Sequence, residues 1–128
     1  MTENELSFNI IGAAIEVHRA IGPGLLESAY EECLCYELEQ RDLKYVRQQL
    51  LPLNYKNVIM KERMYRIDIW VENKVIVDVK SVDTIPIVYK KQVLTYLKQT
   101  HCKLGLILNF NVPVLRDGIE RIVNGLVE

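Results

Sequence analysis

The sequence predicts an α/β domain in which a mixed central sheet of about four strands is flanked by helices, in the order ααβββαβα. Two apolar patterns with helical spacing come first, and three β-rich stretches follow them. A further helical pattern then precedes a short, almost wholly apolar run. The chain has 128 residues, of which 49% are apolar, and this is enough for one hydrophobic core of ordinary size. We therefore expect a single domain over residues 1–128.

The first two elements are predicted to be helices. Thr2 and Glu5 have the spacing of a capping box, and apolar residues then recur at helical spacing as far as Ala20. The next four residues, 21–24, contain Gly-Pro and are typical of a turn, because a proline disfavours the helical conformation of the residue before it. A second helix is expected from about Leu26 to Arg41.

The middle of the chain is predicted to form three antiparallel strands, because its residues are rich in β-branched and aromatic side chains. The strands are expected at Tyr45 to Tyr55, Met64 to Val71, and Val75 to Lys80.

The last part of the chain returns to helical spacing from Ile87 to Thr100, where a third helix is expected. The apolar run from Leu104 to Phe110 has the composition of a central, buried strand. Asp117 is a candidate cap for a closing helix, which would carry four apolar residues: Ile119, Ile122, Val123 and Leu126.

Charge and composition limit the classes of function. The formal charge is −1, which argues against non-specific capture of nucleic acid by bulk charge. No apolar run reaches the length of a membrane span, and the first residues lack the basic start of a secretory signal, so we expect a cytoplasmic protein without a membrane partner. Three cysteines without a CxxC pair predict neither a disulfide nor a structural zinc site.

Two acids and a lysine interrupt strands that are otherwise apolar: Asp68 on one strand, and Asp78 and Lys80 on the next. A three-residue loop at 72–74 places Asp68 directly opposite Asp78, with Cβ atoms about 4.5–5.5 Å apart. Like charges repel in that position, so a divalent cation is expected there, since Mg²⁺ accepts one or two carboxylates together with waters and phosphate oxygens. Lys80 would lie on the same face and orient a water or neutralise a phosphate.

A second interpretation of these residues stays open. Strand alternation is expected to place Ile67 and Ile69 together on one face, and Asp68 with Arg66 on the other. An antiparallel sheet often has one solvated face, on which Asp68 and Asp78 would form ion pairs with their basic neighbours.

Four other residues are candidates whose patterns also have structural explanations. Gln92 and Tyr96 are spaced i, i+4 and share one face of the third helix. Glu27 is in the first turn of the second helix, where the helix dipole stabilises any acid, and His18 ends the first helix, where a cation is stabilised. Five later lysines would form either a local basic patch or a solvated helix face: Lys80, Lys90, Lys91, Lys98 and Lys103.

The segment Gly24-Leu25-Leu26-Glu27-Ser28-Ala29-Tyr30 resembles the pattern that names the GxxExxY proteins. The resemblance covers nearly the whole chain and continues through five further segments: 16–19, 22–24, Asp68 with Asp78-Val79-Lys80, 92–97 and 105–110. This family is similar to compact members of the PD-(D/E)xK nuclease superfamily, whose fold is restriction-endonuclease-like.

The resemblance implies a role for each matched residue. Glu27 resembles the helix acid, Asp68 and Asp78 resemble the two metal carboxylates, and Lys80 resembles the catalytic lysine. Glu27, Asp68 and Asp78 are therefore the expected metal ligands. Two departures are that Ile67 stands where a proline is usual, and that Asp78 stands where relatives more often carry Glu.

The same resemblance extends to residues that would support or bind the substrate. Gln92 and Tyr96 resemble the QxxxY helix of RecB-like exonucleases, and His18 lies in a matched segment and is counted among the supporting residues.

The expected function is phosphodiester hydrolysis of nucleic acid, DNA or RNA, with Mg²⁺ as cofactor and Mn²⁺ as a possible substitute. Two hypotheses of other classes stay open. One is a catalytically silent module that binds nucleic acid or protein on the same fold. The other is a structural homo-oligomer whose interface is an apolar helix face and whose acids keep the surface soluble.

Overall fold

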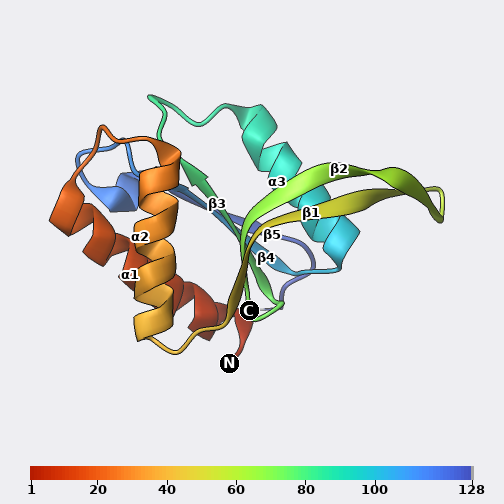
Figure 1. Cartoon of the computed structure of the whole chain (residues 1–128), viewed down its shortest axis with the longest axis horizontal. Helices are drawn as coiled ribbons and strands as arrows, with labels where there is room; N and C mark the ends of the chain where they lie inside the picture. The colour runs from red at the N-terminus through yellow and green to blue at the C-terminus, as the bar shows by residue number, and fades with distance from the viewer. Residues whose placement is uncertain (128) are drawn as a thin grey trace.

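A five-stranded mixed sheet lies at the centre of the protein in the computed structural model, which describes residues 1–127, the side chains of residues 63 and 64 excepted (Figure 1). The strands follow one another across the sheet in chain order. β3 and β4 are parallel, and the other neighbouring pairs are antiparallel. The five strands are β1 (Tyr45–Tyr55), β2 (Val58–Val71), β3 (Val75–Lys80), β4 (Leu104–Asn109) and β5 (Ile119–Val123).

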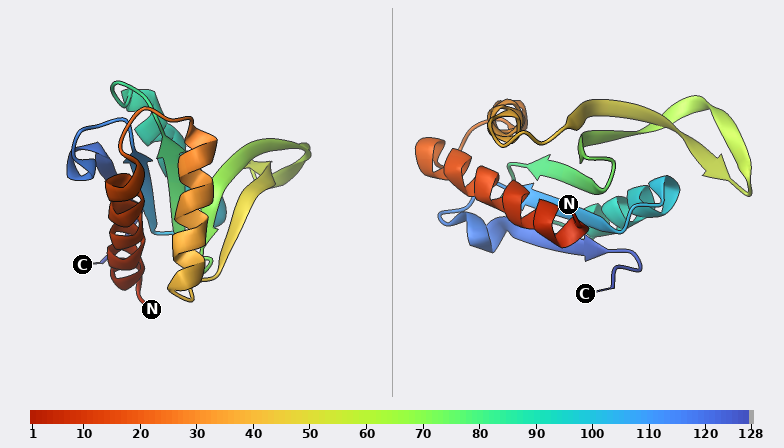
Figure 2. Two further views of the ribbon diagram at one scale, coloured as in Figure 1. Left: turned by 60° about the vertical axis from the view of Figure 1, so that its left-hand side comes forward. Right: turned by 90° about the horizontal axis from the view of Figure 1, so that it is seen from below.

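Helices cover both faces of this sheet. Helices α1 (Glu3–Ile21) and α2 (Glu27–Gln40) lie side by side on one face, and α3 (Ile87–Thr100) covers the other and connects β3 to β4 (Figure 2). The capping box predicted for α1 is present, since the side chains of Thr2 and Glu5 each bond the other's backbone N–H. Within residues 1–127, no helix is long and apolar enough to cross a membrane.

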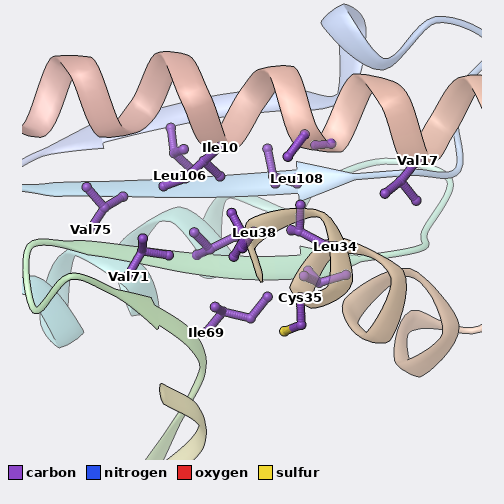
Figure 3. Packing of buried hydrophobic residues seen from close by; sticks show 14 of the residues in the cluster. Ile10, Val17, Leu34, Cys35, Leu38, Ile69, Val71, Val75, Leu106 and Leu108 are labelled. Atoms are coloured by element: carbon purple, nitrogen blue, oxygen red, sulfur yellow. The ribbon is translucent and has the colours of Figure 1, made fainter. Parts of the chain in front are cut away.

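Two apolar cores result from this arrangement. The larger core lies between the helix pair α1–α2 and the sheet, and includes Ile10, Leu34 and Leu106 (Figure 3). The smaller core lies under α3 and includes Ile76 and Val93. Because alternate residues of β3 enter different cores, β3 is buried on both faces, as expected of a strand next to a parallel neighbour.

Strand β2 changes direction at Asp68. Ile69 packs in the larger core, whereas Ile67, two residues earlier, packs in the smaller one. The expectation that Ile67 and Ile69 share a face is therefore wrong. The β2–β3 ladder also ends here, because its last rung pairs Ile69 with Val77. The residues of β2 that precede Ile69 pair with β1 alone.

The part of β2 that precedes Asp68 in the sequence forms a long hairpin with β1, and this hairpin projects past the rest of the molecule (Figure 1). Its tip is a two-residue turn at Lys56 and Asn57, both with positive φ, and this is the turn geometry that matches the twist of two antiparallel strands. The pairing of Tyr55 with Val58 explains why β2 begins at Val58 rather than at the predicted Met64.

The expected closing helix is wrong in detail. Residues Leu115–Gly118 form a short 3₁₀ turn, η1, and the apolar residues that follow form β5 against β4. Pairing with the open edge of β4 satisfies backbone groups that a helix would leave exposed on that strand. Gly118 permits the close approach, because a Cβ there would collide with the carbonyl oxygen of Asn109.

Candidate active site

Asp78 is a buried carboxylate on the α3 side of the central strand β3. The strand alternates, so Asp78 follows Ile76 toward α3 while its neighbours Val77 and Val79 enter the larger core. Its side-chain Oδ1 lies 3.4 Å from Nζ of Lys80. Its Oδ2 is buried and has no hydrogen-bond partner among the described residues. Burial, and then the neighbouring Asp68, raise the pKa of Asp78 to about 7, against the opposing effect of Lys80.

Asp68 reaches the same strand with its side chain. Its Oδ2 accepts a hydrogen bond from the backbone N–H of Val79 at 3.0 Å. This contact lies beyond the last rung of the β2–β3 ladder, so the carboxylate bonds the edge of β3 where β2 no longer does. The predicted register is present over three rungs but does not extend to a backbone pair between Asp68 and Asp78.

Lys80 provides a positive charge beside the two acids. Its side chain is largely buried, and its Nζ lies 4.6 Å from the centre of the Tyr89 ring on α3. Burial lowers the pKa of Lys80, but the charges of Asp78, Glu27 and Asp68 outweigh that effect, and the net shift is upward. Lys80 is therefore a cation at neutral pH, placed to stabilise a negative charge.

These residues line a pocket of about 330 Å³. Gln92 and Tyr96 lie in its wall, so α3 directs both side chains toward the acids. The ring of Tyr96 stacks on that of Tyr65, with centroids 5.0 Å apart. The full lining is Leu50, Tyr65, Arg66, Asp68, Asp78, Lys80, Gln92 and Tyr96.

Glu27 lies on the other side of Asp68. It is exposed at the start of α2, and its Oε2 accepts a hydrogen bond of 3.2 Å from the backbone N–H of Ser81. It lines a second pocket, of about 400 Å³, together with Asp68 but not with Asp78. Among the residues that the structure describes, no three carboxylate, imidazole or thiol groups lie close enough to hold one metal ion. In the described residues Glu27 thus does not form a three-carboxylate group with Asp68 and Asp78, and its role as a metal ligand stays a prediction.

His18 lies away from both pockets. It is buried, and its Nε2 is 2.7 Å from the carbonyl oxygen of Val112, in the segment after β4. Tyr30 stacks on Phe110 at the end of the same strand and donates a hydrogen bond to the carbonyl of Gly22. These contacts give His18 and Tyr30 structural roles, because they connect the two N-terminal helices to the end of the sheet.

Three residues beside the site were not among the sequence predictions: Glu31, Arg47 and Gln48. Glu31 on α2 is buried, and its two oxygens accept hydrogen bonds from Arg47 and Gln48 on β1. All three line the second pocket with Asp68. A local signal existed for Glu31, which follows Glu27 by one helical turn and therefore shares its face.

The chemistry of the Asp68–Asp78 pair fits a divalent cation. Mg²⁺ is held in proteins by one or two carboxylates and keeps several waters, so two acids are sufficient. The unpartnered, buried Oδ2 of Asp78 is an acceptor that a cation would satisfy. Asp68 and Asp78 are therefore the residues that could hold Mg²⁺ or Mn²⁺.

A mixed sheet with helices on both faces, which brings Asp68, Asp78 and Lys80 into one pocket, defines an α/β domain with an acidic pair and a lysine at its sheet. The chain matches the family model described as the PD-(D/E)XK nuclease superfamily over residues 4–122, and it belongs to this superfamily. No curated protein and no solved structure matches the chain.

Proposed function

We propose that the protein is a divalent-metal-dependent nuclease that hydrolyses phosphodiester bonds of nucleic acid, and that it is of the GxxExxY kind. The observation that carries this proposal is the buried, unpartnered Oδ2 of Asp78 beside Asp68 and Lys80 in one pocket. A surface acid with a solvated ion-pair partner would have no reason to keep an unsatisfied oxygen inside the protein.

Asp68 and Asp78 hold Mg²⁺ or Mn²⁺ in this proposal. The bound ion supplies a water of lowered pKa and neutralises charge on the phosphate. Asp68 is oriented by its bond to the backbone of Val79, so its carboxylate is fixed before the substrate arrives. This bond, and not a backbone pair, connects Asp68 to the strand of Asp78, because the β2–β3 ladder ends at Ile69 and Val77.

Lys80 and Glu27 line different pockets, which share Asp68. Lys80 stabilises the negative charge that develops on the phosphate, and its raised pKa keeps it protonated. Glu27 acts through a water rather than as a direct ligand, since of the two pockets that Asp68 lines, it lines the one without Asp78.

The α3 residues Gln92 and Tyr96 bind the substrate in this proposal. The Gln92 amide is a donor for a phosphate oxygen, and the Tyr96 ring offers a surface on which a base or sugar packs. A silent binding module on the same fold is the second candidate. It is favoured by one observation, the absence of a three-acid metal group among the described residues.

A cleavage assay separates the two candidates. The substrates are single- and double-stranded DNA and RNA, each incubated with Mg²⁺, Mn²⁺ or EDTA. We expect the wild type to cleave at least one substrate with a metal and none with EDTA. Lys80→Ala should reduce the rate by about 10²–10³-fold, whereas Lys74→Ala, which changes an exposed lysine just before the start of β3, should retain it. Binding without metal-dependent cleavage of any substrate would support the silent module.

A further inference from the structure

Gln48 has an unusual backbone conformation within strand β1. Its φ is 56°, in the left-handed region that favours glycine, although the residue is not glycine. The rungs before and after it are regular and place it directly opposite Asp68 on β2. Strained backbone of this kind persists only where surrounding contacts impose it, and it gathers at functional sites.

The side chain of Gln48 is bonded to helix α2. Oε1 of Glu31 accepts a hydrogen bond from Nε2 of Gln48 at 2.7 Å, and Oε2 accepts one from Nε of Arg47 at 2.6 Å. Glu31 is buried whereas Arg47 and Gln48 are exposed, so both bonds are partly buried, and hydrogen bonds to a charged group are the stronger kind. One carboxylate thus fixes two successive residues of β1, one of them the strained residue.

The consequence is visible at Asp68. In a regular ladder, a side chain at this position would stand roughly perpendicular to the sheet. Instead, β2 turns at Asp68, and the Asp68 carboxylate lies along the sheet edge and bonds the backbone of Val79. The break in regular pairing on β1 and the turn of β2 occur at the same rung position.

We propose that Glu31 is a positioning residue for the candidate metal site. By holding Gln48 in its left-handed conformation, it prevents regular pairing opposite Asp68 and so directs the Asp68 carboxylate toward Val79 and Asp78. Glu31 itself touches neither metal nor substrate. Its effect on cleavage rests on the proposed function, whereas its effect on Asp68 can be measured without any catalysis.

The experiment measures amide hydrogen exchange of the metal-free protein by NMR, for the wild type and for Glu31→Gln and Gln48→Ala. Alanine lacks the side-chain amide that bonds Glu31 and disfavours the left-handed conformation, so Gln48→Ala removes both the contact and the backbone geometry at an exposed position. We expect exchange at the Val79 amide to accelerate by about tenfold or more in both variants. Amides of the neighbouring strand β4, such as that of Leu106, should not change.

A matched control is available on the same helix. Glu39 accepts a hydrogen bond of 2.7 Å from the hydroxyl of Tyr45, so it also joins α2 to β1, but at the start of that strand. Glu39→Gln should leave exchange at Val79 unchanged. A variant that accelerates exchange at Val79 and throughout β4 alike would show a merely structural role and overturn the proposal, as would unchanged exchange at Val79 in both site variants.

Cleavage kinetics provide the second readout. If the wild type cleaves nucleic acid, Glu31→Gln and Gln48→Ala should lower kcat by about tenfold or more with KM changed less than about twofold, because a misplaced ligand affects the reaction more than substrate binding. Accelerated exchange at Val79 with an unchanged kcat would overturn the positioning role. A wild type without cleavage would overturn the proposed function, and Val79 exchange would still decide whether Glu31 positions Asp68.

Discussion

The Asp68 carboxylate accepts a hydrogen bond from the backbone N–H of Val79 at 3.0 Å, just beyond the last rung between β2 and β3. The Asp68 side chain thus accepts a hydrogen bond from a backbone N–H of β3 that would otherwise bond a neighbouring strand. The same contact ties Asp68 to the strand that carries Asp78 and Lys80. Asp68 therefore has both a structural contact and a proposed role in metal binding, and variants of Asp68 should distinguish these two roles.

Asp68→Asn keeps a side-chain oxygen that can accept the hydrogen bond from Val79, whereas Asp68→Ala leaves that buried N–H without a partner. We expect Asp68→Ala to lower the free energy of unfolding by about 1–3 kcal/mol and Asp68→Asn to lower it by less than about 1 kcal/mol. Both variants should lose cleavage. Chemical denaturation of the metal-free proteins measures the difference, and equal stability of the two variants would contradict the structural role of this bond.

The pH dependence of stability should report on Asp78. Burial and Asp68 raise its pKa to about 7 in the folded protein, whereas an aspartate in the unfolded chain titrates near pH ~4. Below about pH 4 the group is protonated in both states and carries no penalty. Between about pH 4 and 7 only the unfolded state ionises, so the stability of the metal-free protein falls as pH rises.

Asp78→Asn removes this titration and isolates its contribution. In EDTA, the variant should be more stable than the wild type at pH 8, by about 1–3 kcal/mol, and the difference should shrink as pH falls toward about 4. Thermal or chemical denaturation across this pH range measures it. A variant less stable than the wild type at pH 8 would indicate instead that Asp78 is an ordinary ion-pair partner of Lys80.

Gln92 should contribute to substrate binding. Gln92→Ala removes an amide from the pocket wall without touching either acid, so KM should rise by about 5–10-fold, which corresponds to one hydrogen bond, with kcat nearly unchanged. Thr95→Ala, at an exposed position of α3 outside the pocket lining, serves as the control and should leave KM unchanged. Steady-state cleavage of a short substrate provides both constants, and an unchanged KM in Gln92→Ala would remove the residue from the binding surface.

His18 should affect stability and not chemistry. His18→Ala removes the contact with the carbonyl of Val112 and part of a buried ring packing, so the free energy of unfolding should fall by about 1–3 kcal/mol. The cleavage rate per folded molecule should match the wild type. Arg19→Ala, at the exposed neighbouring position, should change neither quantity. A large loss of kcat with normal stability would return His18 to the functional site.

Much of this fold follows from local sequence patterns. The bounds of β1, β3 and α3 agree with the predicted segments, and the three-residue loop at 72–74 gives the predicted register. These elements have clear periodicity and turn residues, which act over a few residues. β5 was missed because its apolar spacing also fits a helix, and only pairing with β4 decides between the two.

The sequence predicts the acids of the candidate site but not their arrangement in space. Asp78, Lys80 and the i, i+4 pair on α3 follow from regular alternation, which continues undisturbed through β3 and α3. The turn of β2 at Asp68 does not follow from this alternation. In our proposal it depends on the contact between Glu31 and Gln48, which are distant in sequence. A conformation imposed by a long-range hydrogen bond leaves no local periodic signal.

The central claim is that Asp68 and Asp78 form a divalent-cation site, and a calorimetric titration of the metal-free protein with Mn²⁺ tests it most directly. The account predicts saturable binding of a single ion by the wild type and an affinity at least about tenfold weaker for Asp78→Asn, since one of two carboxylate ligands is lost. Absence of saturable binding by the wild type, or equal affinity in the variant, would contradict the claim.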